Sequence, residues 1–201
     1  MKTLGVAMLL LACAAGCGSQ TVTKPPATVP APSGDVIRDM KSLYINRDVQ
    51  EYGKILSSDY VFRFVPDPVS GHEDSLSRAE ELNFGNHLFV TGSTDGQEPP
   101  ALSIRLTIDT TSSEPDNRRG HTGWVRYYVQ TSLTLTQTNG AAHNVNGPAI
   151  FYFKQEPAGS GVWKLAEWQD EPVSSRGTRV SPQGATPTAR TSWGSLKKIF
   201  R

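Results

Sequence analysis

Helically spaced apolar residues open the region from residue 35 onward and predict helices there. In DVIRDMKSLYIN the apolar positions recur every three or four residues, and they recur in VQEYGKIL after a cap at Asp48. The aromatic and β-branched run 60–65 then predicts a strand. Ser77 and Glu80 form a capping box, which predicts a third helix through about Leu88. Its inward face is expected to carry Ala79, Leu82, Asn83 and Phe84.

An alternating pattern follows and predicts four antiparallel strands. The segment ALSIRLTIDT places four aliphatic residues on one face: Leu102, Ile104, Leu106 and Ile108. The strands WVRYYVQTSLTLTQ and GPAIFYFKQE flank an Asn139-Gly140 turn, and VWKLAEWQDE completes the set. The order predicts an α+β domain in which a curved, mostly antiparallel sheet carries three N-terminal helices on its concave face.

The long strand WVRYYVQTSLTLTQ separates two rows of side chains. Val125, Tyr127 and Val129 begin an apolar row that continues to Leu133 and Leu135 and is expected to be core. The opposite row is mixed in character and consists of Trp124, Arg126, Tyr128 and Gln130. The mixed row is either an interaction surface or a solvated face, and the pattern leaves both readings open.

The N-terminal residues have the pattern of a leader peptide. Lys2 precedes an uncharged run, 4–12, that is too short to span a bilayer, which takes ~20 apolar residues. The small residues that follow end at Cys17 and resemble the lipobox of bacterial lipoproteins, with alanine at position 14 where that family more often has leucine. The resemblance implies cleavage before Cys17, its lipidation, and a membrane anchor in the bacterial cell envelope, at the outer membrane in a Gram-negative cell. The alternative is an ordinary secretory signal with an incidental cysteine.

The chain therefore divides into a leader (1–16), a lipidated cysteine with a proline-rich tether (17–34), a folded domain (35–173) and a basic tail (174–201). The tail has six basic residues and no acidic one, whereas the rest of the mature chain is acidic. Its last segment, TSWGSLKKIFR, has apolar residues at helical spacing: Trp193, Leu196 and Phe200. Because so short a helix is not stable alone, it must dock. Docking on its own domain is favoured over anionic lipid or a partner.

Composition excludes several classes of protein. The chain has 201 residues, 37% of them apolar, and a formal net charge of +1. A coiled coil, a collagen-like chain, a wholly disordered chain and a strongly basic nucleic-acid binder are excluded, so no nucleic acid is expected as a partner. The two cysteines, Cys13 and Cys17, both lie in or at the end of the leader. Cleavage and lipidation would leave the domain without a disulfide or a catalytic thiol.

Two segments, LYINRDVQEYGKILSSDYVFRF and VWKLAEWQDE, resemble the opening motif and the final strand of the nuclear transport factor 2-like (SnoaL-like) superfamily. The resemblance spans about Asp35 to Val173 and implies a cone-shaped barrel with a deep apolar pocket. Its members include isomerases, dehydratases, polyketide cyclases and non-catalytic binding domains, so the fold does not select a function. The resemblance implies a small apolar ligand and a homodimer through the mixed row of the sheet. The candidate pocket residues are Met40, Tyr44, Phe62, Phe64, His87 and Trp168.

The resemblance reproduces a catalytic pair only in part. In the steroid-isomerase branch, an aspartate near the end of the first strand is the general base, and a tyrosine on the first helix supplies a hydrogen bond. Asp67 in VPDPVSG resembles that aspartate, but counting from Ser58-Asp59 the base position falls on Phe64. The tyrosine position falls on Met40, one turn before Tyr44. A carboxylate between two prolines is more typical of a turn.

No metal or cofactor site is predicted. The four histidines lie in separate segments, and no two of them are three or four residues apart. Phosphate-loop and dinucleotide motifs are absent from the sequence. The favoured function is a non-catalytic envelope module that binds a small ligand or a protein. The alternative is an isomerase or dehydratase that uses Asp67 as its general base.

Overall fold

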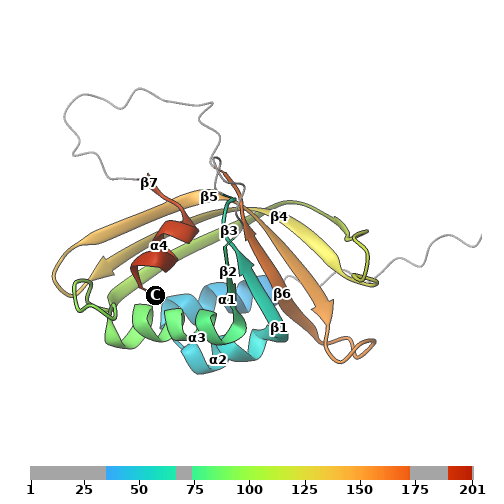
Figure 1. The fold of residues 1–201 in the computed structure, drawn as a ribbon, viewed down its shortest axis with the longest axis horizontal. Coiled ribbons are helices and arrows are strands. Elements are labelled where there is room, and N and C mark those ends of the chain that lie inside the picture. The colour runs from blue at the N-terminus through green and yellow to red at the C-terminus, as the bar shows by residue number, and fades with distance from the viewer. Residues whose placement is uncertain (1–34, 67–73, 173–189, 201) are drawn as a thin grey trace, which may run out of the picture.

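A computed structural model describes residues 35–66, 74–172 and 190–200 (Figure 1). The expected leader, the lipidated Cys17, the tether, Asp67 and the first part of the basic tail lie outside the described residues. None of the described helices has the length and apolar character that a bilayer crossing requires.

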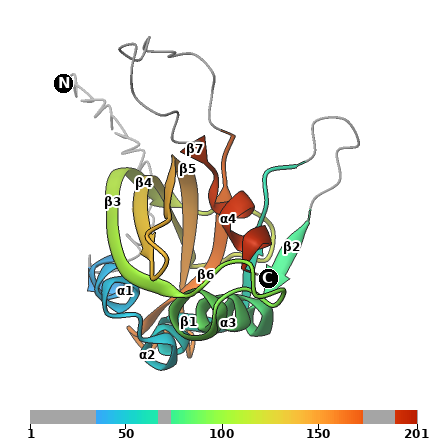
Figure 2. The same ribbon diagram turned by 90° about the vertical axis from the view of Figure 1, so that its left-hand side faces the viewer.

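Three N-terminal helices lie on one side of a curved sheet, as the apolar pattern predicts (Figures 1 and 2). They are α1 (Asp35–Asn46), α2 (Val49–Ile55) and α3 (Arg78–Asn86). Asp48 caps α2 by accepting a hydrogen bond from the Glu51 amide at 3.0 Å. The predicted capping box of α3 is present, since the side chain of Ser77 accepts from the Glu80 amide and the Glu80 side chain accepts from the Ser77 amide.

The inward face of α3 agrees with the prediction in part. Phe84 is buried and Leu82 packs against the core, as predicted, but Ala79 and Asn83 are exposed. Glu81 and Gly85 are buried instead, and the apolar pattern could not mark a carboxylate and a glycine as core positions. A π-helical turn, η1 (His87–Thr91), extends α3 and ends at Gly92. At Gly92, φ is 82° and an added Cβ would lie 2.5 Å from the carbonyl oxygen of Glu98, so only glycine fits.

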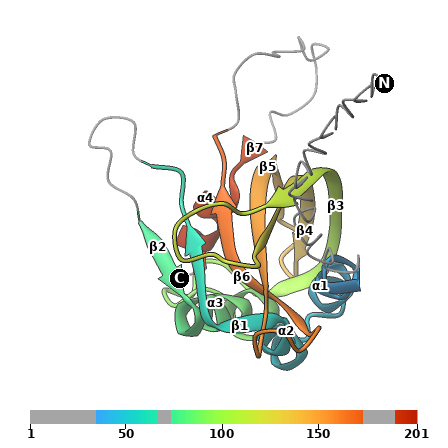
Figure 3. The same ribbon diagram turned by 90° about the vertical axis from the view of Figure 1, so that its right-hand side faces the viewer.

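The strands form one sheet in the order β2-β1-β6-β5-β4-β3, and β7 pairs with β5. Their bounds are β1 (Leu56–Arg63), β2 (Ser75–Ser77), β3 (Ala101–Pro115), β4 (Val125–Gln137), β5 (Ala142–Gln155), β6 (Trp163–Asp170) and β7 (Arg190–Thr191). Pairing is antiparallel along β3, β4, β5 and β6, and parallel between β1 and β6, which lie side by side in Figure 3. β1 starts at Leu56, four residues before the start of the predicted strand at residue 60.

One face of the sheet is core, as the alternation predicts, with one exception. Ile104, Leu106 and Ile108 of β3 are buried, but the side chain of Leu102 is 56% exposed. The prediction for Leu102 is wrong because the register shifts between Ala101 and Ser103, and this irregularity turns the intervening side chain outward. In β4 the apolar row from Val125 to Leu135 is buried, and the mixed row faces the other way.

The C-terminal segment forms a fourth helix, α4 (Trp193–Ile199), on the same side of the sheet as α1–α3 (Figure 2). Ser192 caps it by accepting a hydrogen bond from the Ser195 amide at 3.1 Å. The helix predicted from the spacing of its apolar residues is therefore confirmed, and so is its docking on the chain's own domain.

Candidate functional site

The concave interior of the domain is filled by side chains of α4. Trp193, Leu196 and Phe200 are each 0% exposed. The ring of Trp193 lies 4.6 Å from that of Trp168 and 5.8 Å from that of Tyr44, measured between centroids. Its indole N–H donates a hydrogen bond to the Thr131 hydroxyl at 2.8 Å. The helix is thus part of the core and is fixed there by a buried polar contact.

Gly194 lets the backbone of α4 approach the sheet closely. An added Cβ would lie 2.7 Å from Cδ1 of Phe64, which is closer than ordinary packing allows. The Gly194 amide donates a hydrogen bond to Oδ2 of Asp170 at 3.0 Å. Asp170 is the last residue of β6, so this hydrogen bond connects the first turn of α4 to the end of that strand.

A buried ion pair lies deeper in the interior. Lys197 Nζ donates to both carboxylate oxygens of Glu81 at 2.5 Å, and both side chains are 0% exposed. The Tyr52 hydroxyl donates to Oε1 of the same carboxylate at 2.9 Å. The ammonium also lies 4.3 Å from the ring centroids of Phe62 and Phe84. We call Glu81, Phe62, Phe84 and Trp168 the cage, because they surround the Lys197 ammonium.

Burial sets the electrostatics of the interior. It lowers the pKa of Lys197, against the opposing effects of Glu81 and Asp170. It also raises the pKa of Tyr44, Tyr52 and Tyr60 well above 10.0, and the charge of Glu81 adds to this shift. These hydroxyls are therefore neutral, and the hydroxyl of Tyr52 donates a hydrogen bond to Glu81.

The Asp170 carboxyl has a strongly raised pKa. Burial raises its pKa from 3.8 to about 6, although the Gly194 amide and the Lys197 charge act in the opposite direction. The protonation state of this carboxyl therefore changes over a mildly acidic range, next to the contact that holds α4.

Five of the six residues expected to line a pocket lie in this interior: Met40, Tyr44, Phe62, Phe64 and Trp168. His87 does not join them. Its ring is partly exposed and lies 2.8 Å from the Gly92 carbonyl oxygen and 3.0 Å from the Thr91 hydroxyl, at the end of η1. Tyr44 packs edge-on against Tyr52, Phe89 and Trp193. Its expected partner Asp67 lies outside the described residues.

Sequence reasoning missed Glu81 and Lys197, although a weak signal was present for both. Lys197 stands four residues after Trp193 and three before Phe200, so it occupies the apolar stripe of its helix. Glu81 stands three residues before Phe84 in the same way. A charge at a core position in each of two helices of a small domain is a reason to expect that the two charges meet.

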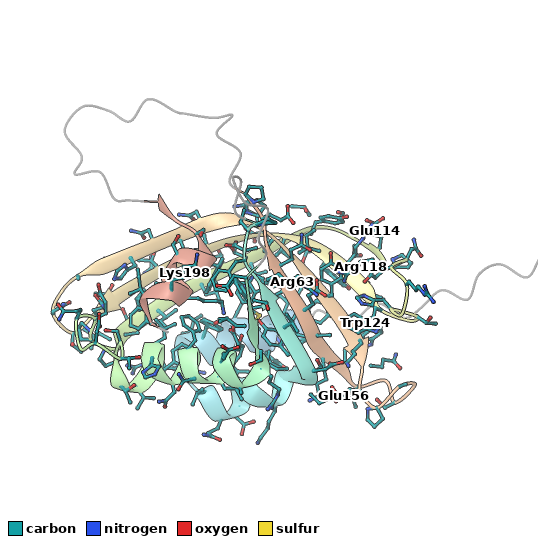
Figure 4. All side chains as sticks on the ribbon, viewed as in Figure 1. Arg63, Glu114, Arg118, Trp124, Glu156 and Lys198 are labelled. Carbon is teal, nitrogen blue, oxygen red and sulfur yellow. The ribbon has the colours of Figure 1, made fainter. Side chains whose placement is uncertain are left out.

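The outer face of the sheet carries the mixed row, held in place by ion pairs. Arg126 pairs with Glu114 of the neighbouring strand β3 at 2.9 Å and lies over the ring of Tyr128 at 5.6 Å. The Tyr128 hydroxyl donates to the same Glu114 carboxylate at 3.0 Å. Trp124 stacks on the His121 ring with 4.0 Å between centroids. Figure 4 shows Glu114 and Trp124 at the same end of the sheet.

The loop between β3 and β4 folds over this outer face. Arg118 binds Asp116 at 2.9 Å and Glu167 at 3.0 Å, and its guanidinium lies 3.8 Å above the ring of Tyr152. Burial raises the pKa of Asp116, but hydrogen bonds from Arg118 and His121 outweigh it and hold that pKa below 3.8. Through these two ion pairs, Arg118 joins Asp116 of the loop to Glu167 of β6, which is typical of a structural or interaction surface.

Among the described residues, no group of three or more His, Cys, Asp or Glu side chains could hold a metal ion.

Solved structures share this architecture at low sequence identity. A conserved protein from Planctomyces limnophilus matches with a TM-score of 0.50 and 15% identity, over 67% of this chain and 88% of that one. A ketosteroid isomerase-like protein from Erwinia carotovora matches with a TM-score of 0.46 and 12% identity, over 69% and 92%. The CaMKII hub of S. rosetta matches with a TM-score of 0.46 and 12% identity, over 72% and 96%. The sequence matches no protein-family model and no curated protein.

These matches concern the fold alone. The chain has an α+β fold, with N-terminal helices packed on a curved, mostly antiparallel sheet. At this level of identity, the fold does not transfer an activity.

Proposed function

We propose that the chain is a lipid-anchored protein of the bacterial envelope whose domain is a non-catalytic interaction module, with a second copy of the chain as its partner. The observation that carries this proposal is the filled interior. Trp193, Leu196 and Phe200 of α4 occupy the space where the family resemblance implies an apolar pocket. A small ligand or a substrate would have to displace this helix, which makes the outer face of the sheet the better candidate for recognition.

The outer face has the composition of an interface. Aromatic rings and arginine are enriched at protein–protein interfaces, and Trp124, Arg126 and Tyr128 follow one another along one strand. The Arg126–Glu114 pair orders these side chains before association, so that less conformational entropy is lost on binding. A two-fold interface must be complementary to itself, and this row places a cation beside an anion.

The alternative function, an isomerase or dehydratase, has less support. It requires Asp67 and Tyr44 beside an open pocket. Asp67 lies outside the described residues, and the Tyr44 ring is 0% exposed beneath Trp193.

The anchor is tested by expressing the full chain and its Cys17→Ala variant in a Gram-negative host. The wild-type chain is expected in the membrane fraction, with the mass of a chain cleaved before residue 17 plus a lipid adduct. Cys17→Ala is expected to lose the adduct and the membrane association. An intact-mass measurement that finds no lipid on the wild-type chain would refute the anchor.

The interaction is tested by sedimentation of the detergent-solubilised chain over a range of concentrations. The wild-type chain is expected to dimerise, and Arg126→Glu is expected to weaken the dimer by reversing one charge of the pair with Glu114. Arg38→Glu is the matched control, because it makes the same change on the exposed surface of α1. A monomeric wild-type chain at its highest soluble concentration, or equal effects of the two variants, would refute the sheet interface.

A further inference from the structure

The cage around Lys197 has the features of a binding site that the chain itself fills. Its walls come from three elements of the domain body: Phe62 from β1, Glu81 and Phe84 from α3, and Trp168 from β6. The occupant comes from a fourth element, α4. The ammonium lies 4.3 Å from Phe62, 4.3 Å from Phe84 and 5.0 Å from Trp168, measured to the ring centroids.

The chemistry of the cage suits a primary ammonium better than an apolar group. A buried ammonium is costly unless a carboxylate and further favourable contacts compensate for its lost hydration. Here the Glu81 carboxylate accepts two N–H bonds, and the faces of the rings supply cation–π attraction. Apolar residues of similar volume often stabilise a core at least as much as a buried ion pair does. We therefore interpret Glu81 and the rings as selecting a cation at this position.

The Tyr52 hydroxyl strengthens this selectivity. It donates to Glu81 Oε1, so the carboxylate is fixed in position whether or not an ammonium is present. The Asp170 charge acts on the same ammonium from the end of β6. A neutral occupant would leave the Glu81 carboxylate buried with one neutral donor and no counterion.

We propose that the cage is a binding site for a primary alkylammonium, a ligand with an unbranched apolar stem and an –NH₃⁺ head, which the Lys197 side chain occupies in this structure. The proposal goes beyond the interaction module, because the cage lies on the opposite side of the sheet from the mixed row and does not depend on dimer formation. Glu81 and the three rings all contact the head, since the hydrogen-bond and ring-centroid distances are all measured from the Lys197 Nζ atom. A tertiary or quaternary ammonium lacks the two N–H groups that Glu81 accepts, and an alcohol lacks the charge.

The test removes the Lys197 side chain beyond Cβ by mutation and then adds a small amine that has the same atoms as the part removed. In Lys197→Ala, the atoms lost are those of n-propylammonium. We expect n-propylammonium chloride to raise the Tm of the full-length variant by about 3 to 5 °C relative to NaCl at the same ionic strength. Propanol and tetramethylammonium chloride are expected to give no comparable rise, and wild-type Tm is expected to stay unchanged because the cage is filled.

Two further variants make the test specific. Lys54→Ala removes a lysine that pairs with Glu51 at 2.5 Å on the surface, and its Tm is expected to be insensitive to the amine. Adding Glu81→Gln to Lys197→Ala is expected to abolish the amine-specific rise. Equal effects of propanol and n-propylammonium, or no rise in a folded Lys197→Ala variant, would overturn the proposal.

If Lys197→Ala is unfolded in NaCl, the same series is followed as refolding by circular dichroism. Recovery of the folded signal in n-propylammonium but not in propanol supports the site. Recovery in both solutions, or in neither, overturns it.

Discussion

The buried pair of Lys197 and Glu81 predicts a strong and non-additive effect on stability. Replacing Lys197 by Met keeps most of the side-chain volume but leaves the Glu81 carboxylate buried, with the Tyr52 hydroxyl as its remaining hydrogen-bond donor in this cluster. Removing one member of a buried ion pair costs about 3 to 5 kcal/mol, because the charge that stays behind has no compensation. Lys197→Met is therefore expected to remove a large part of a stability that is about 5 to 15 kcal/mol for a typical domain.

Glu81→Gln is expected to lower the free energy of unfolding by a similar amount, because here the anion is removed and the buried cation stays behind. It leaves the Lys197 ammonium among three aromatic rings, with the more distant Asp170 as the other charge that acts on it. The double variant buries neither charge. We expect its loss of stability to be no larger than that of either single variant, which corresponds to a coupling energy of about 3 to 5 kcal/mol.

Urea unfolding gives the free energy of unfolding of the four proteins in this cycle, which are the wild type, the two single variants and the double variant. Trp168 and Trp193 are both buried in the interior, so tryptophan fluorescence reports its opening, and far-UV circular dichroism provides a second probe. A shift of the midpoint at constant m-value identifies a change in stability. The surface pair of Lys54 and Glu51 provides the control cycle, and its coupling is expected to be within experimental error. Additive losses at Lys197 and Glu81 would refute the ion pair as an energetic unit.

Three further predictions concern the contacts that support the interior. Gly194→Ala is expected to cost about 1 to 3 kcal/mol in urea unfolding because its Cβ would lie 2.7 Å from Phe64, and an unchanged midpoint would contradict this close approach. Asp170 holds a proton in the folded domain at pH values where the unfolded chain has lost it, since its pKa is raised from 3.8 to about 6. Stability is therefore expected to fall as the pH rises from about 4 to 6, by up to about 3 kcal/mol from this group, and a fall that persists in Asp170→Asn would show that another group causes it. Ser77→Ala is expected to cost about 1 kcal/mol by removing the acceptor for the Glu80 amide, and Ser77→Asn should restore most of it.

Local patterns were sufficient to predict most of the elements. The spacing of Met40 and Tyr44 in α1, the capping box at Ser77, and the alternation along β4 each reflect interactions between residues close in sequence. The prediction failed where tertiary packing overrode the pattern. Leu102 is turned outward by an irregularity in strand register, which depends on the pairing of β3 with β4 and leaves no mark in the sequence of β3 alone.

The interior could be predicted only in part. The spacing of Trp193, Leu196 and Phe200 predicts a helix that must dock, but it does not specify the surface on which the helix docks. The pairing of Lys197 with Glu81 joins residues 116 positions apart. Periodicity describes which side of an element is buried, and a contact between two distant elements requires their relative placement in three dimensions.

The position of α4 has a consequence for the order in which the domain can fold. Trp193 and Phe200 belong to the same core as Met40 and Trp168, yet they are synthesised after every one of the strands β1–β6. A chain that has completed the sheet but not α4 lacks its innermost side chains, so its aromatic interior is open to water. Contacts between residues so far apart in sequence form slowly, because a long loop must close before they stabilise the chain. The last step of folding is therefore expected to be the entry of α4, and a chain cleaved between β6 and α4 should behave as an incomplete folding unit that exposes its core.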